Sequence, residues 1–91
     1  EEVYIRRQGD GWLMKGVTPL SDVEELLDLD FEDEDYDTLN GFLISRLDRI
    51  PSEEEHPDVV YGGCRFLVLK VENKTIGLVR VERLPEEEEH E

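Results

Sequence analysis

The sequence predicts an α+β fold, with two helices packed on a mainly antiparallel sheet of about five strands. Three observations support this prediction. A short hairpin pattern opens the chain, two segments with helical apolar spacing follow it, and the second half contains β-forming runs separated by turn residues. Because the helical and strand segments are grouped rather than alternating, a parallel α/β architecture is not indicated.

The first predicted unit is a β-hairpin. Val3, Tyr4 and Ile5 favour strand structure, Gly9-Asp10-Gly11 is a turn signal, and Trp12-Leu13-Met14 forms the returning strand. Gly16 ends this unit.

A first helix is predicted next. Ser21, with Glu24 three residues later, has the spacing of a capping box, in which each residue satisfies a free backbone N–H. The helix should stop near residues 28–30. Its inward face is formed by four apolar residues, Leu20, Val23, Leu26 and Leu27.

The second helix follows a run of acidic residues. We assign its N-cap to Asp37, because carboxylates are favoured where helix N–H groups are unpaired, and its end to Pro51. Helical spacing places one apolar face inward, formed by Leu39, Phe42, Leu43, Leu47 and Ile50.

The second half of the chain predicts three strands. An exposed polar loop, Ser52–Asp58, leads to the first, Val59-Val60-Tyr61. Gly62-Gly63 provides a turn into a long apolar strand that runs from Cys64 to Val71. Asn73-Lys74 turns the chain back into a strand from Thr75 to Leu84, in which Gly77 marks a bulge.

Length and charge define the class of protein. The 91 residues suffice for one domain, which we place at residues 1–85, and the acidic tail 86–91 is predicted to be disordered. A net charge of −15 argues against binding nucleic acid or an anionic membrane and favours cations or basic partners. The alternative is that the charge maintains solubility.

The single cysteine, Cys64, excludes an intrachain disulfide and is read as a small buried hydrophobe in a reducing compartment. No apolar run approaches the roughly 20 residues that span a bilayer. We expect the chain to be a piece of a longer protein, because it begins at Glu1 without an initiator Met, and the missing part could hold a membrane anchor.

The candidate metal ligands are Asp33, Asp35 and Asp37. Their alternate spacing is that of the first EF-hand ligands, but Thr38 occupies the position of the required Gly and Ile44 that of the bidentate Glu, so an EF-hand is rejected. A looser oxygen site for Ca²⁺ or Mg²⁺ remains, which Glu32 and Glu34 could join. The alternative is a solvated acidic loop that caps a helix.

No residue pattern indicates an enzyme. Only two histidines are present, His56 in a predicted loop and His90 in the tail, and no serine lies in a nucleophile elbow. Gly62-Gly63 lacks the remaining residues of a phosphate-binding loop. The aromatic residues could line a cleft for a nucleotide or flavin, but a core of this size needs them for packing.

Several short motifs, taken in order, carry a family resemblance. Asp10-Gly11-Trp12, the acidic segment running into the second helix, and Tyr61 to Leu69 together resemble the transporter-associated domain of CorC/HlyC proteins, over roughly residues 3–84. The resemblance implies a sandwich related to part of a flavin-binding domain. It also implies a place at the C-terminus of a membrane protein, on the cytoplasmic side, behind a transmembrane region and paired CBS domains. Those proteins are linked to Mg²⁺ and Co²⁺ efflux and, historically, to hemolysin activity.

From the resemblance and the residues together, we expect a non-catalytic accessory domain that modulates ion transport through contacts with neighbouring domains or a second copy of itself. The acidic segment is the expected cation sensor. Where the family often has a charged residue, this chain has Leu67, which makes its strand apolar on both faces and indicates a covered sheet or a self-association surface. The alternative is a module that binds a nucleotide or flavin.

Overall fold

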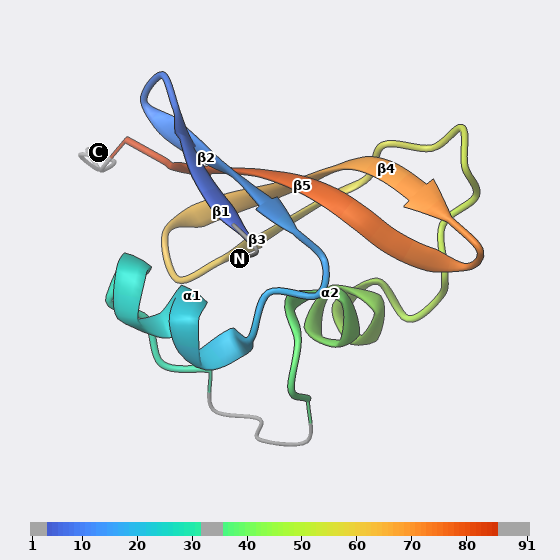
Figure 1. The fold of residues 1–91 in the computed structure, drawn as a ribbon, viewed down its shortest axis with the longest axis horizontal. Helices are drawn as coiled ribbons and strands as arrows, with labels where there is room; N and C mark the ends of the chain where they lie inside the picture. The colour runs from blue at the N-terminus through green and yellow to red at the C-terminus, as the bar shows by residue number, and fades with distance from the viewer. Residues whose placement is uncertain (1–3, 32–35, 86–91) are drawn as a thin grey trace, which may run out of the picture.

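A computed structural model of the chain describes residues 4–31 and 36–85. It confirms the predicted class, since two helices pack on one five-stranded antiparallel sheet (Figure 1). The elements in chain order are β1 (Ile5–Gln8), β2 (Gly11–Lys15), α1 (Leu20–Leu27), α2 (Leu39–Leu47), β3 (Asp58–Tyr61), β4 (Cys64–Glu72) and β5 (Thr75–Arg83).

The strand order in the sheet is β1-β2-β5-β4-β3, with every neighbouring pair antiparallel. Local turns join β1 to β2, β3 to β4 and β4 to β5. The turn residues Gly62 and Gly63 have φ of 61° and 80°, and Asn73 and Lys74 have φ of 54° and 61°. Positive φ at both central residues is the geometry of tight hairpin turns that match the strand twist, so both predicted turns are confirmed.

Both helices lie on the same side of the sheet (Figure 1), and the core fills the space between these two layers. Strand alternation directs one set of side chains toward the helices. The buried apolar side chains of the sheet are Trp12, Met14, Val59, Cys64, Phe66, Val68, Val71, Ile76, Val79 and Val81. They meet Leu20, Val23, Leu27, Leu39, Phe42 and Leu43 from the helices.

The pairing of β4 with β5 shifts register near the predicted bulge. Val68 pairs with Val79 and Val71 with Ile76, while Lys70 pairs with Leu78, so Leu69 and Gly77 have no partner in the register. The carbonyl of Gly77 accepts a hydrogen bond from Gly16 N–H at 3.1 Å, which joins the end of β2 to this irregular point. A Cβ at Gly16 would collide with the Ile76 carbonyl, so this close approach of two backbones requires glycine.

The capping box predicted for the first helix is wrong. Pro19 is the N-cap of α1 and supplies no side-chain hydrogen bond, so Ser21 lies inside the helix. Proline has φ preset near −65° and can open a helix without a capping side chain. Leu26 was also assigned wrongly to the inward face, since it is 39% exposed whereas Leu20, Val23 and Leu27 are buried.

Two assignments for the second helix are also corrected. Thr38 rather than Asp37 is the N-cap of α2, and its Oγ1 accepts a hydrogen bond from Gly41 N–H at 3.2 Å. The helix ends at Leu47, where Asp48 adopts the left-handed conformation with φ of 62°. Ile50 therefore lies beyond the helix and is 46% exposed.

Among the described residues, neither helix has the length and apolar character needed to cross a bilayer. Val3 of the first predicted strand and the acidic tail 86–91 lie outside the described residues.

Candidate functional site

The acidic segment that joins α1 to α2 is the candidate site. Asp33 and Asp35, together with Glu32 and Glu34, lie outside the described residues. Asp37 is described and exposed, and its backbone carbonyl accepts a hydrogen bond from Leu20 N–H at 2.9 Å. The third predicted ligand is therefore tied through its backbone to the start of α1.

The N-terminal end of the segment is anchored at Phe31. Its side chain is buried, and its N–H donates to the Glu24 carboxylate at 2.9 Å. Its ring lies edge-on to Phe42, with centroids 4.6 Å apart, and stacks on Tyr61 at 5.3 Å. Glu24 thus holds the chain after α1 rather than capping the helix start.

A tyrosine and an arginine from distant parts of the sequence complete this anchor. The Tyr61 hydroxyl donates to the Asp30 carbonyl at 2.9 Å. The Arg46 guanidinium lies over the Tyr61 ring, 5.0 Å from its centroid, and also near Phe42 at 5.7 Å. These contacts place a positive charge beside the base of the acidic segment, where cation–π attraction holds it.

The C-terminal end is anchored at Thr38. Thr38 forms an isolated antiparallel bridge with Pro19, and Leu39 N–H donates to the Thr18 carbonyl at 2.9 Å. The described residues on both sides of the acidic segment, Phe31 and Thr38, are therefore fixed on packed elements.

Carboxylates on an anchored segment could bind a hard divalent ion or an organic ammonium ion, since both are recognised by anionic oxygens. Within residues 4–31 and 36–85, no group of three or more His, Cys, Asp or Glu side chains is placed to hold a metal ion. Asp37 thus belongs to no such group among the described residues, and a site that includes Asp33 and Asp35 stays a prediction.

A shallow hollow of about 510 Å³ lies beside the C-terminal anchor. It is lined by residues from the end of the acidic segment, from α2 and from the chain just after it, namely Tyr36, Gly41, Ile44, Ser45, Asp48 and Arg49. The lining combines an aromatic ring, an aliphatic side chain and both signs of charge.

The aromatic residues considered for a ligand cleft are used mainly in packing. Phe42 and Phe66 are buried with ring centroids 6.3 Å apart, and Trp12 is 8% exposed beneath the guanidinium groups of Arg7 and Arg83. Cys64 lies in the same core, where burial raises the pKa of its thiol and the nearby Arg83 charge opposes that shift only in part. This thiol is the buried hydrophobe that the sequence indicated.

Sequence reasoning missed the anchors of the site. Nothing local to Tyr61 or Arg46 signals a contact with residues 30–31, because the pairing depends on how β3 packs beside α2. Thr38 could have been found, since threonine is a common N-cap residue, although aspartate ranks above it.

The fold and the anchored acidic segment define a small α+β domain of the transporter-associated class. The chain belongs to the CorC_HlyC family, "Transporter associated domain", whose sequence pattern it matches over residues 5–85.

Relatives with curated descriptions are much longer proteins. The chain is 36% identical over 90 residues to a "Polyamine export protein" of Haemophilus influenzae, covering 97% of this chain and 20% of that protein. It is 34% identical over 83 residues to the "UPF0053 inner membrane protein YoaE" of Escherichia coli K12, covering 89% of this chain and 16% of that protein. The chain thus spans about one fifth of the length of these relatives.

Solved structures share the fold. A CorC_HlyC domain from Nitrosomonas europaea superposes with a TM-score of 0.79 at 35% identity, covering 91% of this chain and 99% of that one. A Xylella fastidiosa domain, described as "in complex with Mg++ and Mn++", has a TM-score of 0.77 at 25% identity, covering 91% and 100%. A hemolysin domain from Enterococcus faecalis V583 has a TM-score of 0.84 at 24% identity, covering 91% and 100%.

Proposed function

We propose that residues 1–85 form a non-catalytic accessory domain of a membrane transporter, on its cytoplasmic face, which modulates cation export. Its partners are paired CBS domains and the transmembrane region of the same protein, or a second copy of the domain. The observation that carries this proposal is the family match over residues 5–85, in a chain that equals only 20% of the Haemophilus influenzae relative. The remaining four-fifths of such a protein supplies the transport path.

The cargo we propose is a polyamine. This rests on the Haemophilus influenzae relative, which is described as a polyamine exporter and is 36% identical to this chain. Polyamines are flexible polycations, and a domain with a net charge of −15 raises their local concentration at its surface.

A divalent cation, Mg²⁺ or Co²⁺, is the second candidate cargo. A specific observation supports it, because the Xylella fastidiosa domain of the same fold is described as a complex with Mg²⁺ and Mn²⁺. Both candidates are cations that oxygen ligands bind, so the acidic segment could respond to either.

The mechanism we propose is electrostatic. The carboxylates of Asp33, Asp35 and Asp37 repel one another, and the anchors at Phe31 and Thr38 keep them on one short segment. A bound cation relieves that repulsion. The cation shifts the equilibrium toward one arrangement of the domain and its neighbouring domains. The size of the shift equals the difference in the cation's binding free energy between the two arrangements.

The test is calorimetric titration of spermidine, Mg²⁺, Co²⁺ and Ca²⁺ into the domain and into a triple variant, Asp33→Asn, Asp35→Asn and Asp37→Asn. We expect the variant to lose most of the binding of one cation class. A matched control, Glu25→Gln, Glu53→Gln and Glu54→Gln, removes the same charge from exposed positions elsewhere and should retain the binding.

Equal losses in the triple variant and the control would show that only net charge matters and would remove the acidic segment from the mechanism. Stronger binding of spermidine than of the metals would favour the polyamine, and the reverse order would favour the divalent ion.

A further inference from the structure

The face of the sheet that points away from the helices, here called the outer face, is apolar and positively charged. The strand registers place opposite side chains on the same face, so its members follow from the pairing. Its apolar members are Leu13, Val60, Leu67 and Leu78, of which Val60 is 56% exposed.

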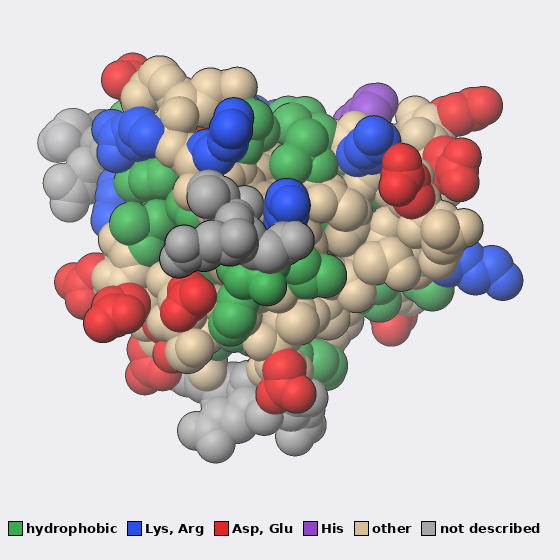
Figure 2. All heavy atoms as spheres, viewed as in Figure 1, with side chains coloured by type: hydrophobic (Ala, Val, Ile, Leu, Met, Phe, Trp, Pro, Cys, Tyr) green, Lys and Arg blue, Asp and Glu red, His purple; other side chains and the backbone are tan. Residues whose placement is uncertain are grey.

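The outer face differs in charge from the rest of the molecule. Among the described residues it carries five basic side chains, Arg6, Lys15, Arg65, Lys70 and Arg80, against three acidic ones, Asp58, Glu72 and Glu82. The whole chain has a net charge of −15. In Figure 2 most of the visible basic side chains lie in the upper half of the view, where Figure 1 shows the sheet, whereas the lower left, where α1 lies, carries acidic ones.

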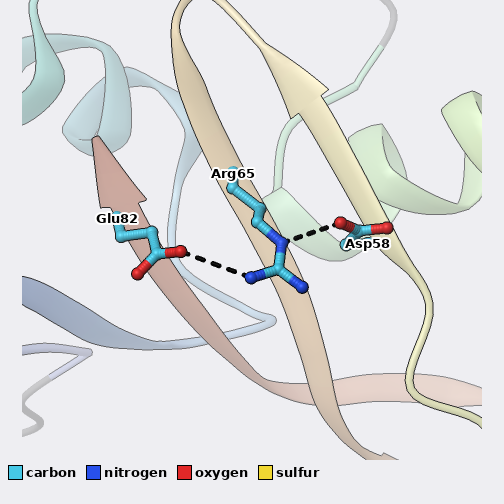
Figure 3. A network of polar contacts seen from close by, with 3 residues as sticks. All are labelled: Asp58, Arg65 and Glu82. Atoms are coloured by element: carbon cyan, nitrogen blue, oxygen red, sulfur yellow. Dashed lines mark hydrogen bonds and ion pairs between the residues drawn. The ribbon is translucent and has the colours of Figure 1, made fainter. Parts of the chain in front are cut away.

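Contacts within the outer face hold its acidic groups. Arg65 on β4 bonds Asp58 on β3 at 2.7 Å and Glu82 on β5 at 3.3 Å, which ties three strands together (Figure 3). The Lys70 Nζ lies 3.4 Å from the Glu72 Oε2. Each of the three carboxylates thus has a basic neighbour on this face, and Asp58, which Arg65 contacts at Oδ2, can accept from a further donor because a carboxylate has two oxygens. The face presents its apolar side chains with a small excess of positive charge.

One row of the outer face is complementary to itself. The registers align Arg6, Leu13, Arg80, Leu67 and Asp58 across the five strands in the order β1-β2-β5-β4-β3. A second copy, related by a two-fold axis in the interface and parallel to the strands, would place its Asp58 over Arg6 and its Leu67 over Leu13. Interfaces of two-fold dimers are self-complementary in this way.

Arg80 lies at the middle of this row, but its guanidinium does not have to face the guanidinium of Arg80 in the other copy. Its Nη1 donates to the Gln8 side-chain oxygen at 2.8 Å and to the Gln8 carbonyl at 3.2 Å. These bonds draw the guanidinium toward β1 and away from the axis, so two copies of Arg80 would point in opposite directions.

The overall negative charge also favours this face over others for self-association. Sheets that pack face to face are about 10 Å apart, and the helices would then form the two outermost layers. The carboxylates of the two copies of α1 would be separated by both sheets, well beyond the Debye length of about 8 Å at physiological salt.

We propose that the outer face binds a second copy of this domain as a two-fold dimer, with Leu13 and Leu67 at its centre and Arg6–Asp58 pairs between the copies. The proposal rests on the contact role in the proposed function and names the surface and the partner.

Sedimentation equilibrium of this chain at low and high NaCl is the test. Salt screens the repulsion between two acidic molecules, so the dimer should tighten as NaCl rises. Leu67→Arg should weaken it at least about tenfold, since a tenfold change corresponds to only about 1.4 kcal/mol and burying an unpaired charge against Leu13 of the other copy costs more than that. Val17→Arg is the matched control, because Val17 is 53% exposed and lies outside the sheet.

A charge exchange tests the proposed pairing itself. Arg6→Asp and Asp58→Arg should each weaken the dimer, and the double variant should bind more tightly than either single variant, although Asp58→Arg also removes the bond from Arg65. Circular dichroism of each variant confirms that the domain is folded.

A monomer at millimolar concentration and high salt would overturn the proposal, as would a dimer that Leu67→Arg leaves unchanged. Self-association that weakens as salt rises would show that attraction between opposite charges outweighs the repulsion between the two molecules, and would overturn the proposed apolar centre. Neither result would affect the cation titration, which tests the proposed function separately.

Discussion

The side-chain oxygen of Asn40 accepts a hydrogen bond from the backbone N–H of Ile76 at 2.8 Å. This contact joins the first turn of α2 to the start of β5, and Asn40 N–H also donates to the Gly16 carbonyl at 2.8 Å. One asparagine therefore ties a helix to two strands that are distant in sequence.

Replacing Asn40 with alanine should lower the free energy of unfolding by about 1–3 kcal/mol, because the N–H of Ile76 would lose its partner in a buried region. Chemical denaturation measures this loss. Ser45→Ala, at an exposed position of the same helix, should change stability by less than about 0.5 kcal/mol. Equal effects of the two substitutions would contradict a specific role for the Asn40 contact.

Thr38→Ala should cost about 1 kcal/mol, since Thr38 Oγ1 caps α2 through Gly41 N–H at 3.2 Å. Thr38→Ser retains the hydroxyl and should recover most of the loss. Thermal unfolding of these variants beside Asp37→Ala tests the corrected cap. A larger loss in Asp37→Ala than in Thr38→Ala would return the cap to Asp37.

Two glycine-to-alanine substitutions should have opposite signs. A Cβ at Gly16 would overlap the Ile76 carbonyl oxygen, so Gly16→Ala should destabilise the domain by about 1–3 kcal/mol or more. A Cβ at Gly41 in α2 would meet only ordinary contacts, 3.6 Å or more away, so Gly41→Ala should stabilise by up to about 1 kcal/mol. Urea denaturation of both variants provides the comparison, and a neutral Gly16→Ala would refute the close backbone approach.

The Glu55 carboxylate should contribute a pH-dependent part of stability. Its hydrogen bond from Arg49 at 2.7 Å, and a second from Ser52 N–H at 2.8 Å, lower the pKa of Glu55 in the folded state. A lowered folded-state pKa means that the contribution is present above the unfolded pKa, about 4.3, and is lost as pH falls through the folded pKa.

The measurement is the difference in unfolding free energy between the parent chain and Glu55→Gln as a function of pH. Taking the difference removes the effect of the many other carboxylates. The gap should narrow as the pH falls below the unfolded pKa, about 4.3, and close as it falls through the folded pKa. Arg49→Ala should reduce the gap at neutral pH, and a gap that persists at low pH would assign the effect to packing.

The hairpin turns were predictable because their chemistry is local. Gly62-Gly63 and Asn73-Lys74 have residue types that tolerate positive φ, and the apolar runs on either side define the strands. The same local reasoning located the irregularity at Gly77. It did not identify Leu69 as the unpaired residue on β4 opposite this irregularity. The register there depends on the hydrogen bond that the end of β2 makes to Gly77.

The helix starts were predicted less well, because several residues could serve as caps and tertiary contacts selected among them. Ser21 and Asp37 are good N-cap residues, yet the backbone bridge between Pro19 and Thr38 fixes both helix starts together. The assignment of Ile50 to the helix was wrong for a related reason. Asp48 ends α2, so the helical spacing does not extend as far as Ile50.

The candidate site was predictable as a run of carboxylates but not as an anchored one. Its position between two helices followed from the apolar spacing on either side. Phe31 contacts Tyr61, and Arg46 contacts the rings of Phe42 and Tyr61. These contacts exist because the sheet packs on the helices, and they join segments up to about thirty residues apart in sequence. No local pattern encodes that arrangement.

The central place of β5, between β2 and β4, has a consequence for how the domain is made. During synthesis β2 leaves the ribosome long before β5, so the N-terminal hairpin cannot pair with β5 until Arg83 has left the exit tunnel. Long-range pairing of this kind is slow to form. A nascent chain stalled before Thr75 would therefore lack the strand that unites the two halves of the sheet, and would be open to capture by chaperones.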